Sequence, residues 1–224
     1  MGLFSARQDL SDRLLARWKP RFYEQPFQMF SDHVSRLLGA LHWVTGSALI
    51  VDSSKSPTYA YLLRTLPSVD LYVMHLVRDS RAVAFSMLRP KLRLEHRDQV
   101  VYLERMSATR VALKWLSWNL AAIPFTRQPD RVRRVRYEDF VADPAATLRH
   151  IGQWLSLDRE LPDLDGSTVR LSANHHINGN PVRFLHGRVA LHEDDEWKVK
   201  MQPSDRWLVT LLTWPLLARY GYLR

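Results

Sequence analysis

Cysteine is absent from the 224-residue chain. Its absence excludes a disulfide framework, a thiolate metal site and a cysteine nucleophile, and it fits a reducing cytoplasm. Long apolar runs are absent too: no stretch approaches the roughly 20 residues of a membrane span, and residues 1–9 hold no apolar core of a signal peptide. We therefore expect a soluble, cytoplasmic protein with no membrane partner.

Acidic residues are fewer than basic ones, which gives a net charge of +9 and a pI near 10.1. Such a balance favours anionic partners, namely nucleic acid, acidic lipid or a phosphorylated small molecule. The basic residues are scattered apart from 131–136, RVRRVR. That run predicts either contact with nucleic acid or a solvated edge strand that its charge protects from aggregation.

Apolar residues at helical spacing predict most of the elements. Ser56 and Pro57 have the residue types of a helix start, and Asp143 and Pro144 have them again. A last helix is expected to kink at Pro215. The predicted helices cover residues 7–19, 22–43, 57–66, 80–88, 99–122, 144–155 and 204–218, and residues 165–203 are expected to be mostly loop.

Three segments have the composition of strands. Residues 48–51 form a short apolar run, and residues 69–77 are so continuously apolar that we expect a strand covered on both faces. Residues 131–137 resemble an edge strand. Strands that alternate with helices predict an α/β fold with a parallel sheet, in which ligands bind beyond the carboxyl ends of the strands.

One domain is expected to span the whole chain. Its predicted parts are a helical region over residues 1–47, an α/β core over 48–164, and a covering loop with the C-terminal helix over 165–224.

Arg78 ends the strongest predicted strand, and a helix begins within two residues, with Asp79 or Ser80 available as N-cap. Free N–H groups, the helix dipole and a guanidinium together suit a phosphate dianion. Ser86, further along the same helix, has a hydroxyl to add. The alternative is that Arg78 simply pairs with Asp79 at the sheet edge.

Lys55 lies at a second junction between a strand and a helix, although only six of the 32 basic residues are lysine. A lysine at such a junction can neutralise the charge that develops on a bridging oxygen during group transfer. The alternative is a solvated surface lysine beside a turn.

The segments 52–57, DSSKSP, and 75–86, HLVRDSRAVAFS, resemble in this order the PAPS-dependent sulfotransferase family, PAPS being 3′-phosphoadenosine 5′-phosphosulfate. The resemblance implies a three-layer, P-loop-type parallel sheet flanked by helices. It also implies that Arg78 and Ser86 hold the 3′-phosphate of the nucleotide and that Lys55 assists sulfuryl transfer. The family's chemistry needs no metal, so none is expected.

Further segments resemble the same family. Residues 135–139, VRYED, resemble the strand whose tyrosine lies near the adenine, which implies that role for Tyr137. Residues 179–184, GNPVRF, with 195–197, DEW, resemble the loop that covers the nucleotide, which implies that Arg183 binds it. The resemblance runs from about residue 48 to the C-terminus.

The departure from the family lies in the first 47 residues, which hold only three glycines. Family members begin with a strand and a Gly/Arg/Ser/Thr-rich loop that cradles the 5′-phosphosulfate, and no such loop is found here. Because that strand lies inside the family's sheet, its omission leaves a row of unpaired backbone groups. Three interpretations stay open: a fragment, a misassigned start, or a degenerate paralogue.

Three functions are therefore weighed. The first is sulfuryl transfer from PAPS to a hydroxyl or amine of a small-molecule or carbohydrate acceptor, with Asp52 and His75 as candidate bases by proximity alone. The second is a PAP(S)-binding remnant without turnover, PAP being the desulfated product. The third is a nucleic-acid-binding module. The first function, sulfuryl transfer, is expected to involve no nucleic acid as a partner.

Two other chemistries find little support in the sequence. Phosphoryl transfer is disfavoured, because there is no Gly-x-x-x-x-Gly-Lys-Ser/Thr motif and no clear magnesium carboxylate. The remaining candidates for a metal site are histidines without recognised ligand spacing: His175, His176, His186 and His192.

Overall fold

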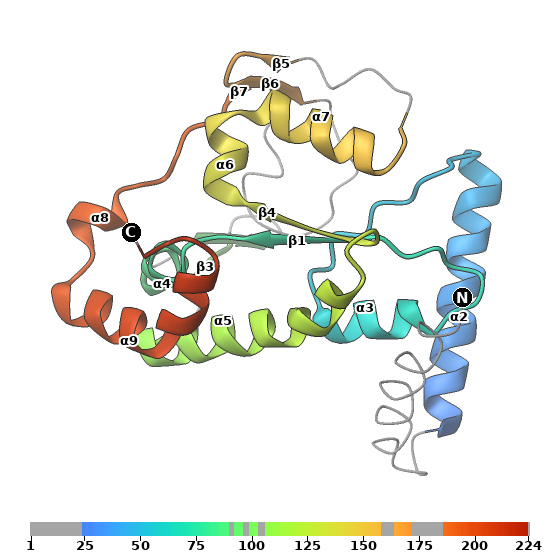
Figure 1. Ribbon diagram of the computed structural model, residues 1–224, viewed down its shortest axis with the longest axis horizontal. Coiled ribbons are helices and arrows are strands. Elements are labelled where there is room, and N and C mark those ends of the chain that lie inside the picture. The colour runs from blue at the N-terminus through green and yellow to red at the C-terminus, as the bar shows by residue number, and fades with distance from the viewer. Residues whose placement is uncertain are drawn as a thin grey trace. The chain divides into compact units, whose positions relative to one another are not determined.

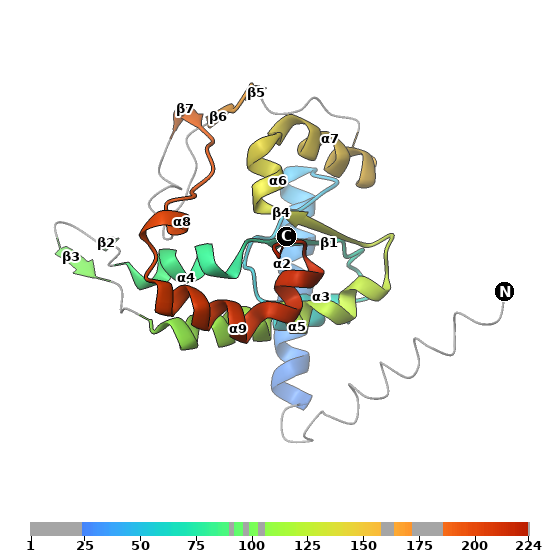
Figure 2. The ribbon, with the colours of Figure 1, turned by 60° about the vertical axis from the view of Figure 1, so that its left-hand side comes forward.

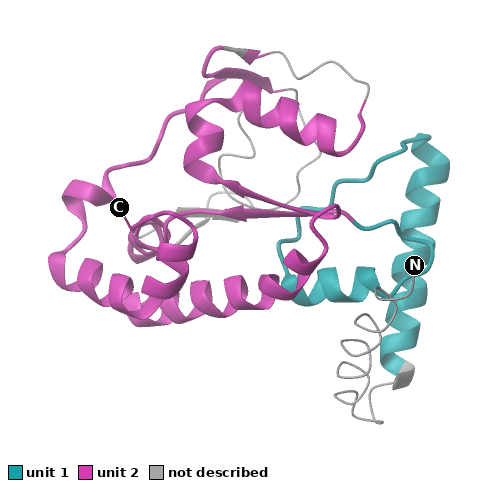
Figure 3. Ribbon diagram, viewed as in Figure 1, with its two compact units in different colours: residues 1–71 teal, residues 72–224 magenta. Residues whose placement is uncertain are grey.

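The computed structural model describes residues 24–89, 92–95, 99–102, 106–157, 164–171 and 186–223. The chain divides into two compact units, residues 1–71 and 72–224 (Figure 3). The helix predicted over residues 7–19 lies outside the described residues.

The first unit contains helices α2 (Glu24–Thr45) and α3 (Pro57–Arg64). Both were predicted, and α3 begins as expected, because Ser56 Oγ accepts a hydrogen bond from the Tyr59 N–H at 3.4 Å. The two helices pack around a small buried cluster formed by Val34, Leu62, Leu63 and Leu66.

The strand predicted over residues 48–51 is wrong. These residues take no regular structure, and Val51 is 78% exposed. A short apolar run becomes a strand only where a neighbouring strand accepts and donates its backbone hydrogen bonds, and no described strand pairs with this one.

The second unit is built on a parallel pair of strands, β1 (Val73–Val77) and β4 (Val132–Arg136). The register runs from Val73 opposite Val132 to Val77 opposite Arg136. Among the described strands none pairs with the second edge of either one. The prediction of an α/β fold with a parallel sheet is confirmed, and the larger P-loop-type arrangement stays a prediction.

Strand β1 is not covered on both faces, and that prediction is wrong. Its side chains alternate: Val77 is 1% exposed, whereas Met74 and Leu76 are 48% and 57% exposed. Although the run is continuously apolar, only one face of β1 is packed against helices.

Helices α4 (Ser80–Leu88), α5 (Ala108–Ala122) and α9 (Pro203–Arg219) lie together on one side of the sheet, as Figures 1 and 2 both show. Trp115 of α5 and Leu216 of α9 pack against Val77. Thr213 donates to the Val209 carbonyl, so the buried Ser80 hydroxyl donates to Thr213, at 2.7 Å. This side holds most of the unit's buried residues.

Helices α6 (Tyr137–Ala142) and α7 (Pro144–Trp154) lie on the other side (Figure 1). Asp143 caps α7 as predicted, accepting from the Ala146 N–H at 2.9 Å. Trp154 meets Tyr72 edge-on, with ring centroids 5.5 Å apart, and so ties α7 to the start of β1.

The remaining elements correct two predictions. Helix α5 begins at Ala108, and the start of the helix predicted over 99–122 is a strand that pairs with an earlier one. The stretch 165–203, expected to be mostly loop, contains strands and a short helix. The elements of this stretch are β5 (Leu164–Asp165), β6 (Thr168–Leu171), β7 (Gly187–Ala190) and α8 (Trp197–Lys200). The strand pair that precedes α5 is β2 (Leu92–Glu95) and β3 (Gln99–Tyr102), and the 3₁₀ helix η2 (Ile123–Arg127) follows α5.

The C-terminal helix has nearly the predicted bounds, and the kink at Pro215 stays a prediction. Pro215 lies inside α9, and Gly221 follows its end with φ of 78°, the left-handed region that glycine enters without strain. None of the helices in the described ranges is long and apolar enough to cross a membrane.

Leu217→Ala tests the packing of α9. The side chain is 0% exposed, so we expect its truncation to lower the free energy of unfolding by about 3 kcal/mol, from lost burial and the cavity left behind. Leu211→Ala is the matched control, because Leu211 lies on the same helix and is 51% exposed. Urea titration of both variants checks the difference, and equal losses would contradict this packing.

Candidate anion-binding site

The carboxyl ends of β1 and β4 bring two predicted site residues together. Arg78 follows the last residue of β1, and Tyr137 follows the last residue of β4. Because the strands are parallel and in register, both side chains leave the same edge of the sheet. The guanidinium carbon of Arg78 lies 4.6 Å from the centroid of the Tyr137 ring, within cation–π range.

The backbone at Arg78 is held from two sides. Trp115, which is 8% exposed, donates its indole N–H to the Arg78 carbonyl at 3.0 Å. The next N–H along the chain, that of Asp79, donates to Glu138 Oε1 at 3.1 Å. The strand tip is therefore fixed, while the side chain of Arg78 leaves it.

Of the two N-cap candidates, Asp79 rather than Ser80 caps α4, and it accepts from the Arg81 N–H at 2.8 Å. Its carboxylate also binds the Arg81 guanidinium, at 2.6 to 3.2 Å. Two corrections follow. The N–H groups of Asp79 and Arg81 already have carboxylate partners, and Asp79 pairs with Arg81 rather than with Arg78. The predicted phosphate site therefore cannot use these two N–H groups, and the Arg78 side chain becomes its main candidate.

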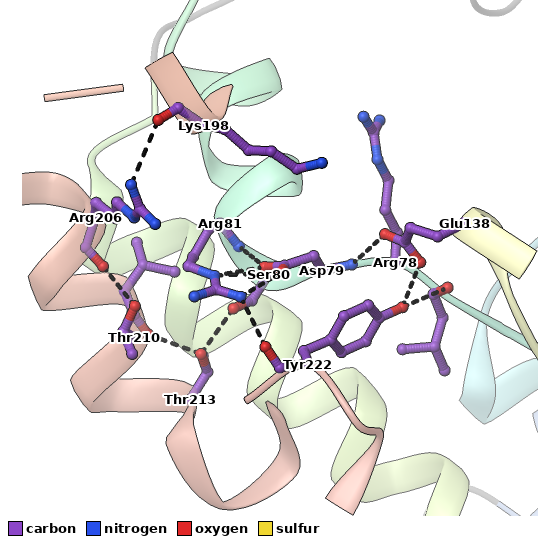
Figure 4. A network of polar contacts seen from close by, with 12 residues as sticks. Arg78, Asp79, Ser80, Arg81, Glu138, Lys198, Arg206, Thr210, Thr213 and Tyr222 are labelled. Atoms are coloured by element: carbon purple, nitrogen blue, oxygen red, sulfur yellow. Dashed lines mark hydrogen bonds and ion pairs between the residues drawn. The ribbon is translucent and has the colours of Figure 1, made fainter. Parts of the chain in front are cut away.

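Glu138 is the centre of a polar network beside the strand tip (Figure 4). Its Oε2 accepts from the Tyr222 hydroxyl at 2.7 Å, while the Tyr222 carbonyl accepts from Arg81 Nη2 at 3.1 Å. Burial, and secondarily the Glu138 carboxylate, raise the pKa of Tyr222 well above its ordinary value, so the hydroxyl stays a donor at neutral pH. Figure 4 shows the Arg78 side chain extending away from this network.

The Arg78 guanidinium has one carboxylate partner, and one of its donors is buried without a partner among the described residues. Its Nη2 donates to Asp194 Oδ2 at 3.0 Å and to the Asp194 carbonyl at 3.2 Å. Its Nε is buried without a hydrogen-bond partner in the part of the chain that the structure describes. A buried, unsatisfied donor on an arginine at a strand tip fits an additional anionic acceptor.

Three residues of this site were not predicted from the sequence: Glu138, Tyr222 and Asp194. Glu138 could have been found from the sequence, because it follows Tyr137 at a predicted strand end. Asp194 also left a signal, since residues 193–196, EDDE, are a run of acidic residues in a strongly basic chain. Tyr222 left none.

The other predicted binding residues have different outcomes. Ser86 lies on α4, and about 9 Å of helix separates it from Ser80 by the usual rise per residue. It falls on the same side of the helix as Asp79, two turns away. Arg183 lies outside the described residues. The roles of both stay predictions.

Lys55 belongs to the first unit and lies in the turn before α3. Its side chain is exposed and its φ is 66°, a left-handed conformation that side chains other than glycine rarely adopt. The turn is shaped by Asp52, whose Oδ1 accepts from the Ser54 N–H at 2.7 Å. This bond gives Asp52, one of the two candidate bases, a structural role.

His75, the other candidate base, lies in β1, and its side chain contacts Asn119 of α5 and Tyr220. Asn119 donates its Nδ2 to the Trp115 carbonyl at 2.8 Å, so its oxygen faces the histidine and accepts from His75 Nε2 at 3.0 Å. The His75 ring also meets Tyr220 edge-on, with centroids 5.9 Å apart. Burial lowers the pKa of His75, and these contacts support a structural role.

Metal-ligating side chains do not gather in the described residues: no group of three or more could hold an ion. Of the histidines that the sequence raised as candidates, His175 and His176 lie outside the described residues.

Comparison with known protein families matches residues 7–161 to the sulfotransferase family. The match covers more than half of the chain, and the chain belongs to this family. It begins upstream of residue 48, where the resemblance was expected to start, and it does not include residues 162–224 with Arg183 and Asp194. No match is found among curated proteins or among solved structures.

The partly buried His75 predicts a dependence of stability on pH. Because the folded state lowers its pKa, the unfolded chain binds a proton first as the pH falls below about 6.5, so stability is lost there, by up to about 1.4 kcal/mol per pH unit. His75→Gln keeps an amide donor at the Nε2 position and does not titrate. Urea titrations at pH 7.5 and pH 5 should therefore show a smaller loss for His75→Gln than for the native chain.

His150→Gln is the control for that measurement, because His150 is exposed. We expect it to lose stability between the two pH values as the native chain does. A loss in His75→Gln equal to that of the native chain would show that burial of His75 does not cause the effect.

Proposed function

We propose that this member of the sulfotransferase family binds PAPS with the Arg78 guanidinium on the 3′-phosphate, and passes the sulfuryl group to a hydroxyl or amine. The observation that carries the proposal is the guanidinium itself. It leaves the tip of a parallel strand, lies over the Tyr137 ring, and has a buried Nε with no described hydrogen-bond partner. Family membership supplies the chemistry.

A 3′-phosphate meets the needs of this guanidinium. Arginine binds phosphate through two parallel N–H bonds, and such charge-assisted bonds are about twice as strong as neutral ones. The unsatisfied Nε would gain an acceptor, and Tyr137 would present a flat ring beside the nucleotide. Ser86 and Arg183 complete the proposed binding set on the strength of the family resemblance.

PAPS, when bound, supplies an activated sulfuryl group, which an acceptor oxygen or nitrogen takes as PAP leaves. Lys55 is proposed to stabilise the negative charge that grows on the departing bridging oxygen. Its left-handed backbone supports this role, since non-glycine residues in that region cluster at functional sites. The acceptor is proposed to be a small molecule or a carbohydrate.

A second candidate is a PAP(S)-binding protein without turnover. It is favoured by one sequence observation, the lack of a recognisable glycine-rich 5′-phosphosulfate loop among the first 47 residues. This candidate shares the Arg78 site and differs only in the transfer step. The two experiments that follow separate binding from transfer.

The binding experiment is calorimetric titration of the chain with PAP. Loss of the guanidinium in Arg78→Ala removes charge-assisted hydrogen bonds, so we expect affinity to fall at least tenfold. Arg149→Ala is the matched control, because Arg149 is exposed on α7 and should leave affinity unchanged. Equal affinity of the native chain and Arg78→Ala would remove Arg78 from the site.

The transfer experiment uses PAPS labelled with radioactive sulfate and a panel of hydroxyl and amine acceptors. Lys55→Asn removes the ammonium but keeps a residue that tolerates the left-handed backbone. We expect transfer to fall by about 10²-fold while PAP affinity holds. Labelled product from the native chain would refute the binding-only candidate; transfer unaffected by Lys55→Asn would refute the role of the lysine.

A further inference from the structure

Residues 193–196, EDDE, form an acidic segment between β7 and α8. Every carboxylate in it contacts a basic side chain. Glu193 and Asp195 both face Lys198, and Glu196 faces Arg89 and Lys200. Most of these pairs join residues close in sequence, which is the ordinary behaviour of charges around a short helix.

Asp194 and Glu196 both reach arginines far away in the sequence, and Asp194 is the one that reaches Arg78 of the candidate site. It accepts from Arg78 Nη2 with its side chain at 3.0 Å and with its carbonyl at 3.2 Å. This is the guanidinium that the proposed function assigns to the 3′-phosphate. A carboxylate and a phosphate oxygen make the same kind of hydrogen bond to arginine, so the two compete for one position.

We infer that Asp194 is an internal competitor of the nucleotide, an autoinhibitory contact that lowers the affinity of Arg78 for phosphate. The inference rests on the proposed function of Arg78. The exposures of the two side chains fit it: that of Asp194 is 41% exposed and that of Arg78 is 22% exposed. The carboxylate can therefore turn to water while the guanidinium keeps its place over Tyr137.

The competition raises the apparent dissociation constant of a phosphate ligand at Arg78 by a constant factor. While the ion pair is formed, Arg78 does not offer its Nη2 to a ligand, so the apparent dissociation constant rises by the inverse of the open fraction. Half-exposed ion pairs have modest strength, which corresponds to about a fivefold effect. For a transferase, the same contact favours release of the desulfated product, because Asp194 returns to Arg78 as PAP leaves.

The test is calorimetric titration of the full chain and two variants, Asp194→Asn and Asp195→Asn, with PAP and with adenosine 5′-monophosphate. The variants remove one negative charge from adjacent positions, and Asp195 contacts only Lys198 among its described basic neighbours, at 3.9 Å. Adenosine 5′-monophosphate lacks the 3′-phosphate, so it does not compete with Asp194. Circular dichroism confirms that each variant is folded.

We expect Asp194→Asn to bind PAP about fivefold more tightly than the native chain, and Asp195→Asn to bind it as the native chain does. Affinity for adenosine 5′-monophosphate should not change. If Asp194→Asn binds PAP and the other two proteins show no measurable binding, the inference is also supported, because the ion pair then competes strongly enough to prevent detectable binding.

Three results would overturn the inference while the Arg78 site stands: unchanged PAP affinity in Asp194→Asn, weaker affinity in that variant, or equal tightening in both variants. The last would be a general effect of charge. A different failure belongs to the proposed function, namely no PAP binding by the native chain or by either variant, and the inference would fall with it.

Discussion

The geometry of the site depends on the carboxylate of Glu138. One of its oxygens holds the N–H of Asp79 at the tip of β1, and the other holds the hydroxyl of Tyr222 near the C-terminus. Three segments that are remote in sequence therefore meet at one side chain. Both oxygens of Glu138 are used inside the protein, so this carboxylate fixes the backbone at the strand tip, while the Arg78 side chain extends away from it.

Arginine, rather than lysine, dominates the basic residues, and the second unit shows what the guanidinium contributes. The arginines of the run 131–136 lie over aromatic rings of the same unit. Their planar, weakly hydrated head groups suit such stacking, which an ammonium matches less well. The four arginines of this basic run thus have aromatic partners within the same unit. The stacked pairs are Arg131–Tyr72, Arg133–Trp154, Arg134–Tyr220 and Arg136–Tyr222.

Local chemistry explains what could be predicted from the sequence. The caps of α4 and α7, Asp79 and Asp143, need only a few neighbouring residues, and both were found. The strand end that carries Arg78 follows an apolar run, and the one that carries Tyr137 follows a basic segment with the composition of an edge strand. Pairing between distant segments could not be read in this way, so the apolar run 48–51 was assigned to a strand that no partner supports. The contact of Asp194 with Arg78 was missed for the same reason, because no local pattern fixes which arginine a carboxylate meets.

The pairing of Val73 with Val132 also bears on how the chain folds. Parallel neighbours need a long crossover, here including α4 and α5, and the entropy of closing that loop opposes the contact until the helices are in place. Topologies rich in such distant contacts fold slowly. The helices can form early from local signals, whereas the juxtaposition of Arg78 with Tyr137 arises only when the sheet closes. The geometry of the candidate site is therefore among the last features that this chain acquires as it folds.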